Sequence, residues 1–264
     1  MVEKIITSVQ NTRIKELKKI FTRKGRKKAG QYILEGPHLV EMAIQAQADI
    51  DMIYYVPESS HAHIEKFRNM NDALPFTQVT PEVAKSLSQT EQHQDIFAVA
   101  TLPEAKEIHF DHLNHAVLIL DQVQDPGNLG TIIRTADAFG YRDVILGKGT
   151  VDLFNDKVLR SMQGSHFAVN TYELDLDEAI PALKAHDYFI ATTELNDRAH
   201  AANAFDLQRK GKWAIVLGNE GNGVSQMVQE LTDVSLYIPM IGSAESLNVA
   251  IAGAIVMYQF PPKS

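Results

Sequence analysis

The acidic residue Glu220 lies inside a glycine-rich stretch, residues 218–223 (GNEGNG), between the apolar run 213–217 and a helix-like segment. Glycine-rich turns that lead from a strand into a helix suit a nucleotide or a phosphate, because free backbone N–H groups point out of the helix start. The spacing matches neither a P-loop nor GxGxxG, so a plain tight turn stays an alternative. A carboxylate at a helix entrance is either a capping group or a functional acid.

A second polar pair, Asn128 and Arg134, follows the apolar run 117–120 and an intervening polar loop. At 100° per residue, the apolar residues of segment 129–139 gather on one helix face, and Arg134 lies nearly opposite them. Asn128 fits the N-cap of this helix. Periodicity alone favours a solvated Arg134, as most helical arginines are, but its position after a strand end leaves a role in a site open.

A third segment of the same kind covers residues 237–258. Ile238 lies in the last part of an apolar strand, a short Gly/Ser loop follows, and a helix begins near Ser246, Leu247 and Asn248. Ser246 as an N-cap is a sufficient structural explanation. The helix is rich in Ala, Gly and aliphatic residues, so it packs closely against a sheet or another chain and is compatible with a subunit interface.

The elements around these segments predict how they are positioned. Apolar strand-like runs at 116–120, 143–147, 188–192, 213–218 and 234–239 alternate with helix-like segments at 129–139, 155–163, 176–186, 224–231 and 246–258. This alternation predicts an α/β domain whose parallel sheet is covered on both faces. Ligands bind such sheets at the carboxyl ends of the strands, so we expect the three segments to meet at one edge.

The preceding residues predict a smaller α/β unit. Strand-like runs at 32–36, 51–56, 76–79 and 96–102 alternate with helix-like runs at 37–46, 63–70 and 81–87. Segment 101–115 is polar and without periodicity, which indicates a linker. We therefore predict a first domain with a basic arm at 1–100, a linker at 101–115 and a second domain at 116–264.

The net charge of −8 hides an asymmetry between the first 30 residues and the rest. Residues 1–30 hold ten Lys or Arg and two acids, whereas the remainder holds 15 basic and 31 acidic residues. A basic arm on an acidic body predicts contact with a polyanion, because Lys and Arg displace counterions from phosphates. A solvated helix with a charged face is the alternative.

Composition excludes several classes of protein. The 45% hydrophobic and 22% charged residues are typical of a globular chain, and the absence of cysteine excludes disulfides and thiolate metal sites. The first ten residues do not resemble a signal peptide and no run of 18 apolar residues occurs, so we expect a cytoplasmic protein without a membrane span. The ten histidines are scattered and no GxSxG elbow is present, so we expect neither a metal site nor a serine nucleophile.

Together, the three segments resemble the motifs of the SpoU (TrmH-like) branch of the SPOUT RNA methyltransferases. The motifs are N-x-G-x-x-x-R at Asn128, Gly130 and Arg134, L-G-x-E-x-x-G at Leu217, Gly218, Glu220 and Gly223, and I-P-M-x-G-x-x-x-S-L-N-V from Ile238 to Val249. Residues 32–44 and 94–100 resemble the opening and the closing strand of that family's L30e-like substrate-binding domain. The basic arm resembles members directed to ribosomal RNA.

The resemblance implies a fold and a cofactor that the residue patterns alone do not supply. It implies an α/β fold in which the C-terminal parallel-sheet domain carries a deep trefoil knot, beside a smaller N-terminal L30e-like α/β domain. It also implies a homodimer and S-adenosyl-L-methionine as the methyl donor. The implied cofactor-binding residues are Gly218, Ile238 and Leu247, largely through backbone groups, with Thr193 as a further candidate.

The implied reaction is methyl transfer to a ribose 2′-hydroxyl, with ribosomal RNA as the expected substrate. The implied catalytic residues are Arg134, Asn128, Glu220, Ser246 and Asn248. The planar guanidinium of Arg134 suits a phosphate, and Glu220 either orients Arg134 or accepts the hydroxyl proton. The other three residues order the site.

Four alternatives stay open at this point. The first three are a tRNA 2′-O-methyltransferase, a non-catalytic RNA-binding protein on the same scaffold, and an enzyme of this fold that modifies a base nitrogen. The fourth alternative, a nucleotide-dependent oxidoreductase, lacks the early glycine fingerprint and its acidic ribose partner.

Overall fold

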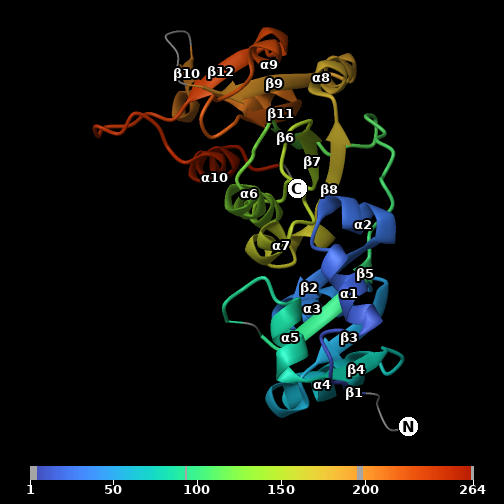
Figure 1. Ribbon diagram of the computed structural model, residues 1–264. Helices are drawn as coiled ribbons and strands as arrows, with labels where there is room; N and C mark the ends of the chain where they lie inside the picture. Colours follow the sequence, from blue (N-terminus) through green and yellow to red (C-terminus); the bar gives the residue numbers. More distant parts are fainter. Residues whose placement is uncertain (1–4, 93, 195–198, 263–264) are drawn as a thin grey trace. The chain divides into compact units, whose positions relative to one another are not determined.

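The computed structural model describes residues 5–92, 94–194 and 199–262 (Figure 1). The chain groups into two compact units, an N-terminal unit of Met1–Glu104 with Phe154–Phe167 and a C-terminal unit of Ala105–Leu153 with Ala168–Ser264. Segment 154–167 therefore groups with the N-terminal unit, although its place in the sequence is between two strands of the predicted second domain. The predicted domain boundaries had no such exchange. Within the described residues, no helix is both long and apolar enough to cross a membrane.

The N-terminal unit is built on a mixed sheet with strand order β1-β4-β3-β5-β2. Its strands are β1 (Ile5–Ile6), β2 (Gln31–Glu35), β3 (Ile50–Tyr55), β4 (Phe76–Val79) and β5 (Ile96–Thr101). Its helices are α1 (Thr12–Lys19), α2 (Arg23–Ala29), α3 (Pro37–Gln45), α4 (Pro57–Met70), α5 (Pro81–Leu87), α7 (Asp156–Met162) and the 3₁₀ turn η1 (Ser165–Phe167). The strand and helix types predicted from 32 to 102 are confirmed.

The basic N-terminal segment is part of this unit's core and not a free arm. Ile14 and Leu17 of α1 are fully buried in one cluster with Val83 and Leu87 of α5. The basic side chains left exposed on the two helices are Lys15, Lys18, Lys19, Arg23, Lys24, Lys27 and Lys28. Lys4, also counted in the basic arm, lies outside the described residues. The segment is thus both a packed part of the domain and a charged surface.

The C-terminal unit holds a seven-stranded parallel sheet in the order β10-β12-β9-β11-β6-β7-β8. Its strands are β6 (Ala116–Leu120), β7 (Asp143–Gly147), β8 (Asn170–Leu174), β9 (Tyr188–Thr193), β10 (His200–Ala201), β11 (Lys212–Leu217) and β12 (Val234–Tyr237). Edge strand β8 was not predicted, because its sequence NTYEL is mostly polar and only half-buried. The predicted α/β class with a parallel sheet is confirmed.

Helices cover both faces of this sheet. They are α6 (Pro126–Ala138), α8 (Leu176–Ala185), α9 (Gln226–Leu231) and α10 (Val249–Gln259), with 3₁₀ turns η2 (Ala202–Ala204) and η3 (Leu207–Lys210). Val216 of β11 packs into the cluster that holds α8 and α9, whereas the next residue, Leu217, contacts Gly253 of α10. Successive strand residues point to opposite faces, so α10 lies on the face opposite α8 and α9. Helices α6 and α10 pack side by side (Figure 1).

Two helix starts differ from the predictions. Helix α6 begins at Pro126 and is capped by Asp125, whose carboxylate accepts a 2.9 Å hydrogen bond from the Asn128 backbone N–H. Asn128 is therefore in the first turn and not the N-cap, because Asp125 caps well and Pro126 suits the first helical position. Likewise Asn248, not Ser246, caps α10 by accepting from the backbone N–H groups of Ala250 and Ile251.

Candidate active site

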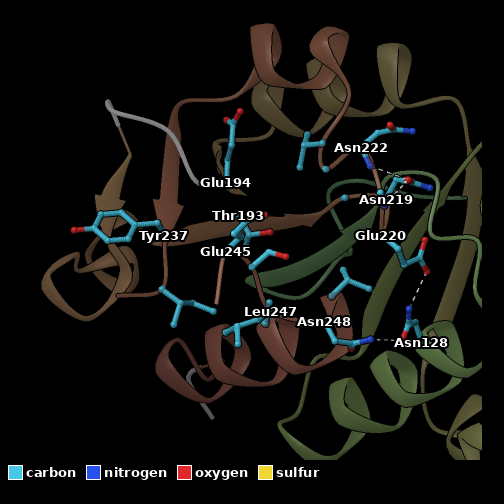
Figure 2. A pocket seen from close by; sticks show the side chains of 18 of the residues that line it. Asn128, Thr193, Glu194, Asn219, Glu220, Asn222, Tyr237, Glu245, Leu247 and Asn248 are labelled. Carbon is cyan, nitrogen blue, oxygen red and sulfur yellow. Dashed lines mark hydrogen bonds between the residues drawn. The ribbon is translucent and has the colours of Figure 1, made fainter. Parts of the chain in front are cut away.

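A cavity of about 760 Å³ opens at the carboxyl ends of β9, β11 and β12, where their loops meet the first turns of α6 and α10 (Figure 2). These strands are adjacent in the sheet, so their carboxyl ends lie at one edge. Eight of the nine predicted site residues line this cavity: Asn128, Thr193, Gly218, Glu220, Ile238, Ser246, Leu247 and Asn248. The structure therefore brings residues of all three sequence motifs together.

A chain of hydrogen bonds links the three motifs at one end of the cavity. The Asn128 side-chain amide donates to a Glu220 carboxylate oxygen at 3.0 Å, and the Asn128 carbonyl oxygen accepts from the Asn248 amide at 2.9 Å (Figure 2). The side-chain carbonyl oxygen of Asn248 caps α10. Asn248 therefore has only its side-chain NH₂ group to present to Asn128. The orientation of both asparagines is thus fixed by their partners.

The Glu220 carboxylate holds the loop that leads into α6. Besides Asn128, it accepts from the backbone N–H of Asp125 at 2.9 Å and of Gln124 at 3.1 Å. Partial burial raises the pKa of Glu220, but these hydrogen bonds to the charged form outweigh burial, so the net pKa lies below its ordinary value of 4.5. A carboxylate stabilised in its charged form is a poor acceptor for a proton at neutral pH.

Arg134 is exposed on α6, opposite the helix's buried face, as the periodicity predicts. It is not among the residues that line the cavity. Within the described part of the chain, the hydrogen bonds of Glu220 go to residues 124, 125 and 128 and not to Arg134. The hypothesis that Glu220 orients Arg134 therefore has no contact to support it, and Arg134 is free to meet a ligand from outside.

The glycine turn can follow its path only without side chains at Gly218. A Cβ added to Gly218 would lie 2.2 Å from the carbonyl carbon of Gly223, because these two residues cross backbone to backbone. Asn219 closes the turn by accepting from the N–H groups of Gly221 and Asn222 and donating to the Gln122 carbonyl.

The hydroxyl of Thr193, a predicted cofactor-binding residue, donates a hydrogen bond within the sheet, to the Val216 carbonyl at 3.2 Å.

Sequence reasoning missed three residues of this region. Asp121 is buried at the end of β6, Asn219 braces the glycine turn, and Glu194 lines the cavity after β9. Their common signal is position, since each follows an apolar strand directly or after one residue. Within the described residues, no group of three or more His, Asp or Glu side chains could hold a metal ion.

Comparison with known proteins identifies the family. Residues 115–258 match the family model described as "SpoU rRNA Methylase family", and residues 11–98 match "MRM3-like substrate binding domain". The chain belongs to the SpoU rRNA methylase family. A curated relative, the 23S rRNA (guanosine(2553)-2′-O)-methyltransferase RlmP of Bacillus subtilis (strain 168), is 40% identical over 255 residues, which cover 97% of this chain and 98% of the relative.

Solved structures of the SpoU family share the whole fold. An RNA 2′-O ribose methyltransferase superposes with a TM-score of 0.84 at 28% identity and covers 97% of each chain. The AdoMet-bound rRNA methyltransferase from Sinorhizobium meliloti gives a TM-score of 0.84 at 26% identity, covering 97% of this chain and 96% of that one. The likeness therefore extends over both units of this SpoU-family chain.

The residues of the cavity fit S-adenosyl-L-methionine, the cofactor of the SpoU family. At Gly218 the backbone itself forms the wall, and Ile238 and Leu247 line the same cavity. Among the described lining residues there are four carboxylates and no Lys, Arg or His. The four are Asp125, Glu194, Glu220 and Glu245. This charge suits a donor that carries a sulfonium and an ammonium group against one carboxylate.

Proposed function

We propose that this protein transfers a methyl group from S-adenosyl-L-methionine to a ribose 2′-hydroxyl of ribosomal RNA. The observation that carries the proposal is the hydrogen-bonded chain from Glu220 through Asn128 to Asn248, which joins all three family motifs at one end of the cavity. The printed name of the Bacillus subtilis relative, a 23S rRNA 2′-O-methyltransferase, supports both the acceptor group and the class of RNA.

One set of residues binds the methyl donor, and another set binds the RNA. The bound donor supplies an electrophilic methyl group on a sulfonium. Gly218, Ile238 and Leu247 hold it by their backbone groups, while Asn128 and Asn248 order the end of the cavity nearest α6. Transfer needs the acceptor oxygen in line with that methyl group, so a rigid cavity end lowers the barrier by pre-orienting the reactants.

Arg134 acts on the RNA from outside the cavity. Its guanidinium stays protonated and presents a planar fork of donors, which can hold the phosphate next to the acceptor ribose. A fixed positive charge there also stabilises the negative charge that develops on the 2′-oxygen as its proton passes to solvent water. Glu220 is a positioning residue for Asn128 and for the loop 124–125, and Ser246, exposed beside Leu247, contacts the incoming RNA.

The N-terminal unit binds the RNA body. The exposed lysines of α1 and α2 give a cationic surface on a protein of net charge −8, and phosphate contacts of this kind do not depend on base sequence. The match of residues 11–98 to a substrate-binding domain supports this role. The proposed RNA-binding domain covers residues 1–100, and residues 101–115 are the proposed linker to the catalytic domain.

We also propose that two copies pair through α10. One side of the helix, including Ala250, Gly253, Val256 and Met257, is buried in its own unit. The side chains of Ile251, Ile255 and Tyr258 follow each other at helical spacing and are 52%, 40% and 72% exposed. An apolar stripe on an otherwise packed helix is what a self-complementary interface needs.

Two further parts belong to the proposal. They are the deep trefoil knot in the C-terminal unit, which the resemblance to the family implies, and a cytoplasmic location.

Mapping 2′-O-methylation tests this function. Ribosomal and transfer RNA from a strain lacking the gene is compared, nucleotide by nucleotide, with RNA from the parent and from strains complemented with the wild-type or Arg134→Ala chain. We expect one ribosomal site to lose its methyl group, and the wild-type gene alone to restore it. A loss confined to transfer RNA, or no loss at any site, would contradict the proposed substrate.

A further inference from the structure

The buried carboxylate of Asp121 lies at the carboxyl end of β6 and has no part in the function described above. Asp121 is 3% exposed, and Asp143 is the other buried carboxylate among the described residues of the sheet, at the amino end of β7. Burying a carboxylate is costly unless hydrogen bonds compensate it. We therefore expect the Asp121 carboxylate to make hydrogen bonds that an apolar side chain could not make.

Asp121 holds both ends of the glycine turn. Its backbone N–H donates to the Leu217 carbonyl at 2.8 Å, at the residue where β11 ends. Its carboxylate accepts from the Ser225 backbone N–H at 2.7 Å, at the residue that caps α9. One residue thus pins the first and the last backbone group of segment 217–225, which contains both Gly218 and Glu220.

Inside these two anchor points the turn closes on itself. Asn219 and Gly223 exchange two backbone hydrogen bonds, at 2.8 and 3.0 Å, and Gly218 crosses Gly223 in close contact. The turn is therefore a compact unit. Asp121 holds its two ends, and Asn219 and Glu220 hold its middle against residues 122–128. The Ser225 hydroxyl is buried, and the described residues offer it no hydrogen-bond partner, so it does not provide a second anchor.

We propose that Asp121 is a positioning residue for cofactor binding: its carboxylate, through Ser225, fixes the glycine turn that forms the wall of the cavity. This inference rests on the proposed function, because it assumes that S-adenosyl-L-methionine occupies this cavity. Without the Asp121 carboxylate, the end of the turn at Ser225 and α9 can move away from β6, while Asn219 and Glu220 still hold the first half of the turn. Gly218 would then move out of the cavity wall. The hydrogen bonds of Glu220 to the backbone of residues 124 and 125 would be weakened.

Three variants separate positioning from general stability. Asp121→Ala removes the acceptor, whereas Asp121→Asn keeps an acceptor oxygen and serves as the conservative rescue. Ser225→Pro removes the donor from the other side, since proline lacks the N–H and the φ of −64° at Ser225 suits it. The matched control is Asp143→Ala, which breaks hydrogen bonds from Asn114 and Asn170 at the opposite edge of the same sheet.

Calorimetric titration with S-adenosylhomocysteine and with S-adenosyl-L-methionine gives the decisive measurement, at a temperature where circular dichroism shows each variant folded. We expect Asp121→Ala and Ser225→Pro to raise the Kd at least about tenfold, since about 1.4 kcal/mol corresponds to one anchoring hydrogen bond. Asp121→Asn should stay within about threefold of wild type and Asp143→Ala unchanged. If Asp121→Ala does not fold, Ser225→Pro and Asp121→Asn carry the comparison.

Kinetics add a readout that a loss of folded protein would not give. We expect the KM for the methyl donor to rise in Asp121→Ala, whereas a merely destabilised chain would lose active enzyme at unchanged KM. The inference is overturned if folded Asp121→Ala and Ser225→Pro bind like wild type, or if Asp143→Ala weakens binding equally. A wild-type chain that bound neither compound would instead overturn the proposed function, and the inference with it.

Discussion

Glu220 and Asn128 are 92 residues apart in the sequence, and in the structure the Asn128 amide donates a 3.0 Å hydrogen bond to the Glu220 carboxylate. Asn248, a further 28 residues along the chain from Glu220, completes the chain of contacts through the other atom of the Asn128 amide group. Replacing any member removes a hydrogen bond that orients its neighbour. The three motifs therefore act as one unit, and their substitutions should not be additive.

Glu220→Gln should weaken activity by ordering the site less well. The glutamine keeps one carbonyl oxygen, but its NH₂ group faces a backbone N–H of Gln124 or Asp125, so one hydrogen bond becomes a repulsive contact. We expect kcat to fall about tenfold. Asn128→Ala should cost about as much, and the double variant little more than either, in single-turnover assays. Exposed Glu178→Gln on α8 is the control. Additive losses would show that the two residues act separately.

Arg134→Ala should abolish most turnover without affecting the cofactor. Because Arg134 is exposed and does not line the cavity, the Kd for S-adenosylhomocysteine should stay at the wild-type value. Loss of one fixed positive charge near a developing oxyanion should lower kcat by about 100- to 1,000-fold. Arg134→Lys should recover only part, since an ammonium lacks the planar fork. The control is Arg209→Ala, whose side chain is 85% exposed. Near-normal turnover with full RNA binding would remove Arg134 from the mechanism.

Replacing Lys24, Lys27 and Lys28 of α2 by glutamine should weaken RNA binding and flatten its salt dependence. Each phosphate contact contributes about 0.7 to 0.9 to the slope of log K against log salt, so the slope should drop by about 2–3. These side chains are exposed, so folding should be unaffected, whereas deletion of residues 1–28 would remove Ile14 and Leu17 from the core. Filter binding across a salt series measures the slope, with Lys85→Gln as the control. An unchanged slope would make this face an ordinary solvated one.

His166 should make the protein less stable in mild acid. Burial lowers the pKa of His166 from 6.5 to about 4, and both ring nitrogens are buried with no hydrogen-bond partner among the described residues. Between pH 6.5 and 4 the unfolded chain therefore binds the proton more readily, and stability falls as the pH drops through this window. The loss at pH 5 should be about 2 kcal/mol relative to pH 8.

Urea unfolding of wild type and His166→Phe at the two pH values isolates that contribution. The phenylalanine keeps a ring among Tyr32, Phe154 and Phe167, which surround His166. It cannot titrate, so the difference between pH 8 and pH 5 should shrink by about the 2 kcal/mol assigned to His166. An equal pH dependence in both proteins would assign the acid sensitivity to other groups.

Ile255→Glu should separate the proposed dimer. The substitution places a charge in the exposed apolar stripe of α10, where a self-complementary contact would bring two copies of it together. We expect sedimentation equilibrium to show a dimer for wild type and a monomer for Ile255→Glu, with unchanged circular dichroism. Ile5→Glu, at a residue that is 49% exposed in the N-terminal unit, is the control. A monomeric wild type would contradict the interface.

The local sequence pattern is enough to predict the elements that carry the site. Runs such as 116–120 are apolar at every residue, which is typical of strands buried on both faces of a parallel sheet. A polar loop and a segment with helical periodicity follow each run. The type of strand and the functional edge of the sheet can therefore be predicted from local pattern. The family motifs could be read for the same reason, because each is a short stretch of neighbouring residues. The catalytic roles drawn from the motifs stay predictions.

How these elements meet depends on contacts between residues that are distant in the sequence. Local pattern carries no information on the order β10-β12-β9-β11-β6-β7-β8, on polar edge strand β8, or on the grouping of 154–167 with the N-terminal unit. It also misplaced the caps at Asn128 and Ser246, since a nearby Asp or Asn can compete for the same backbone N–H groups. Asp121 gave no signal as an anchor, because its partner Ser225 is 104 residues away and only folding brings the two groups within 2.7 Å.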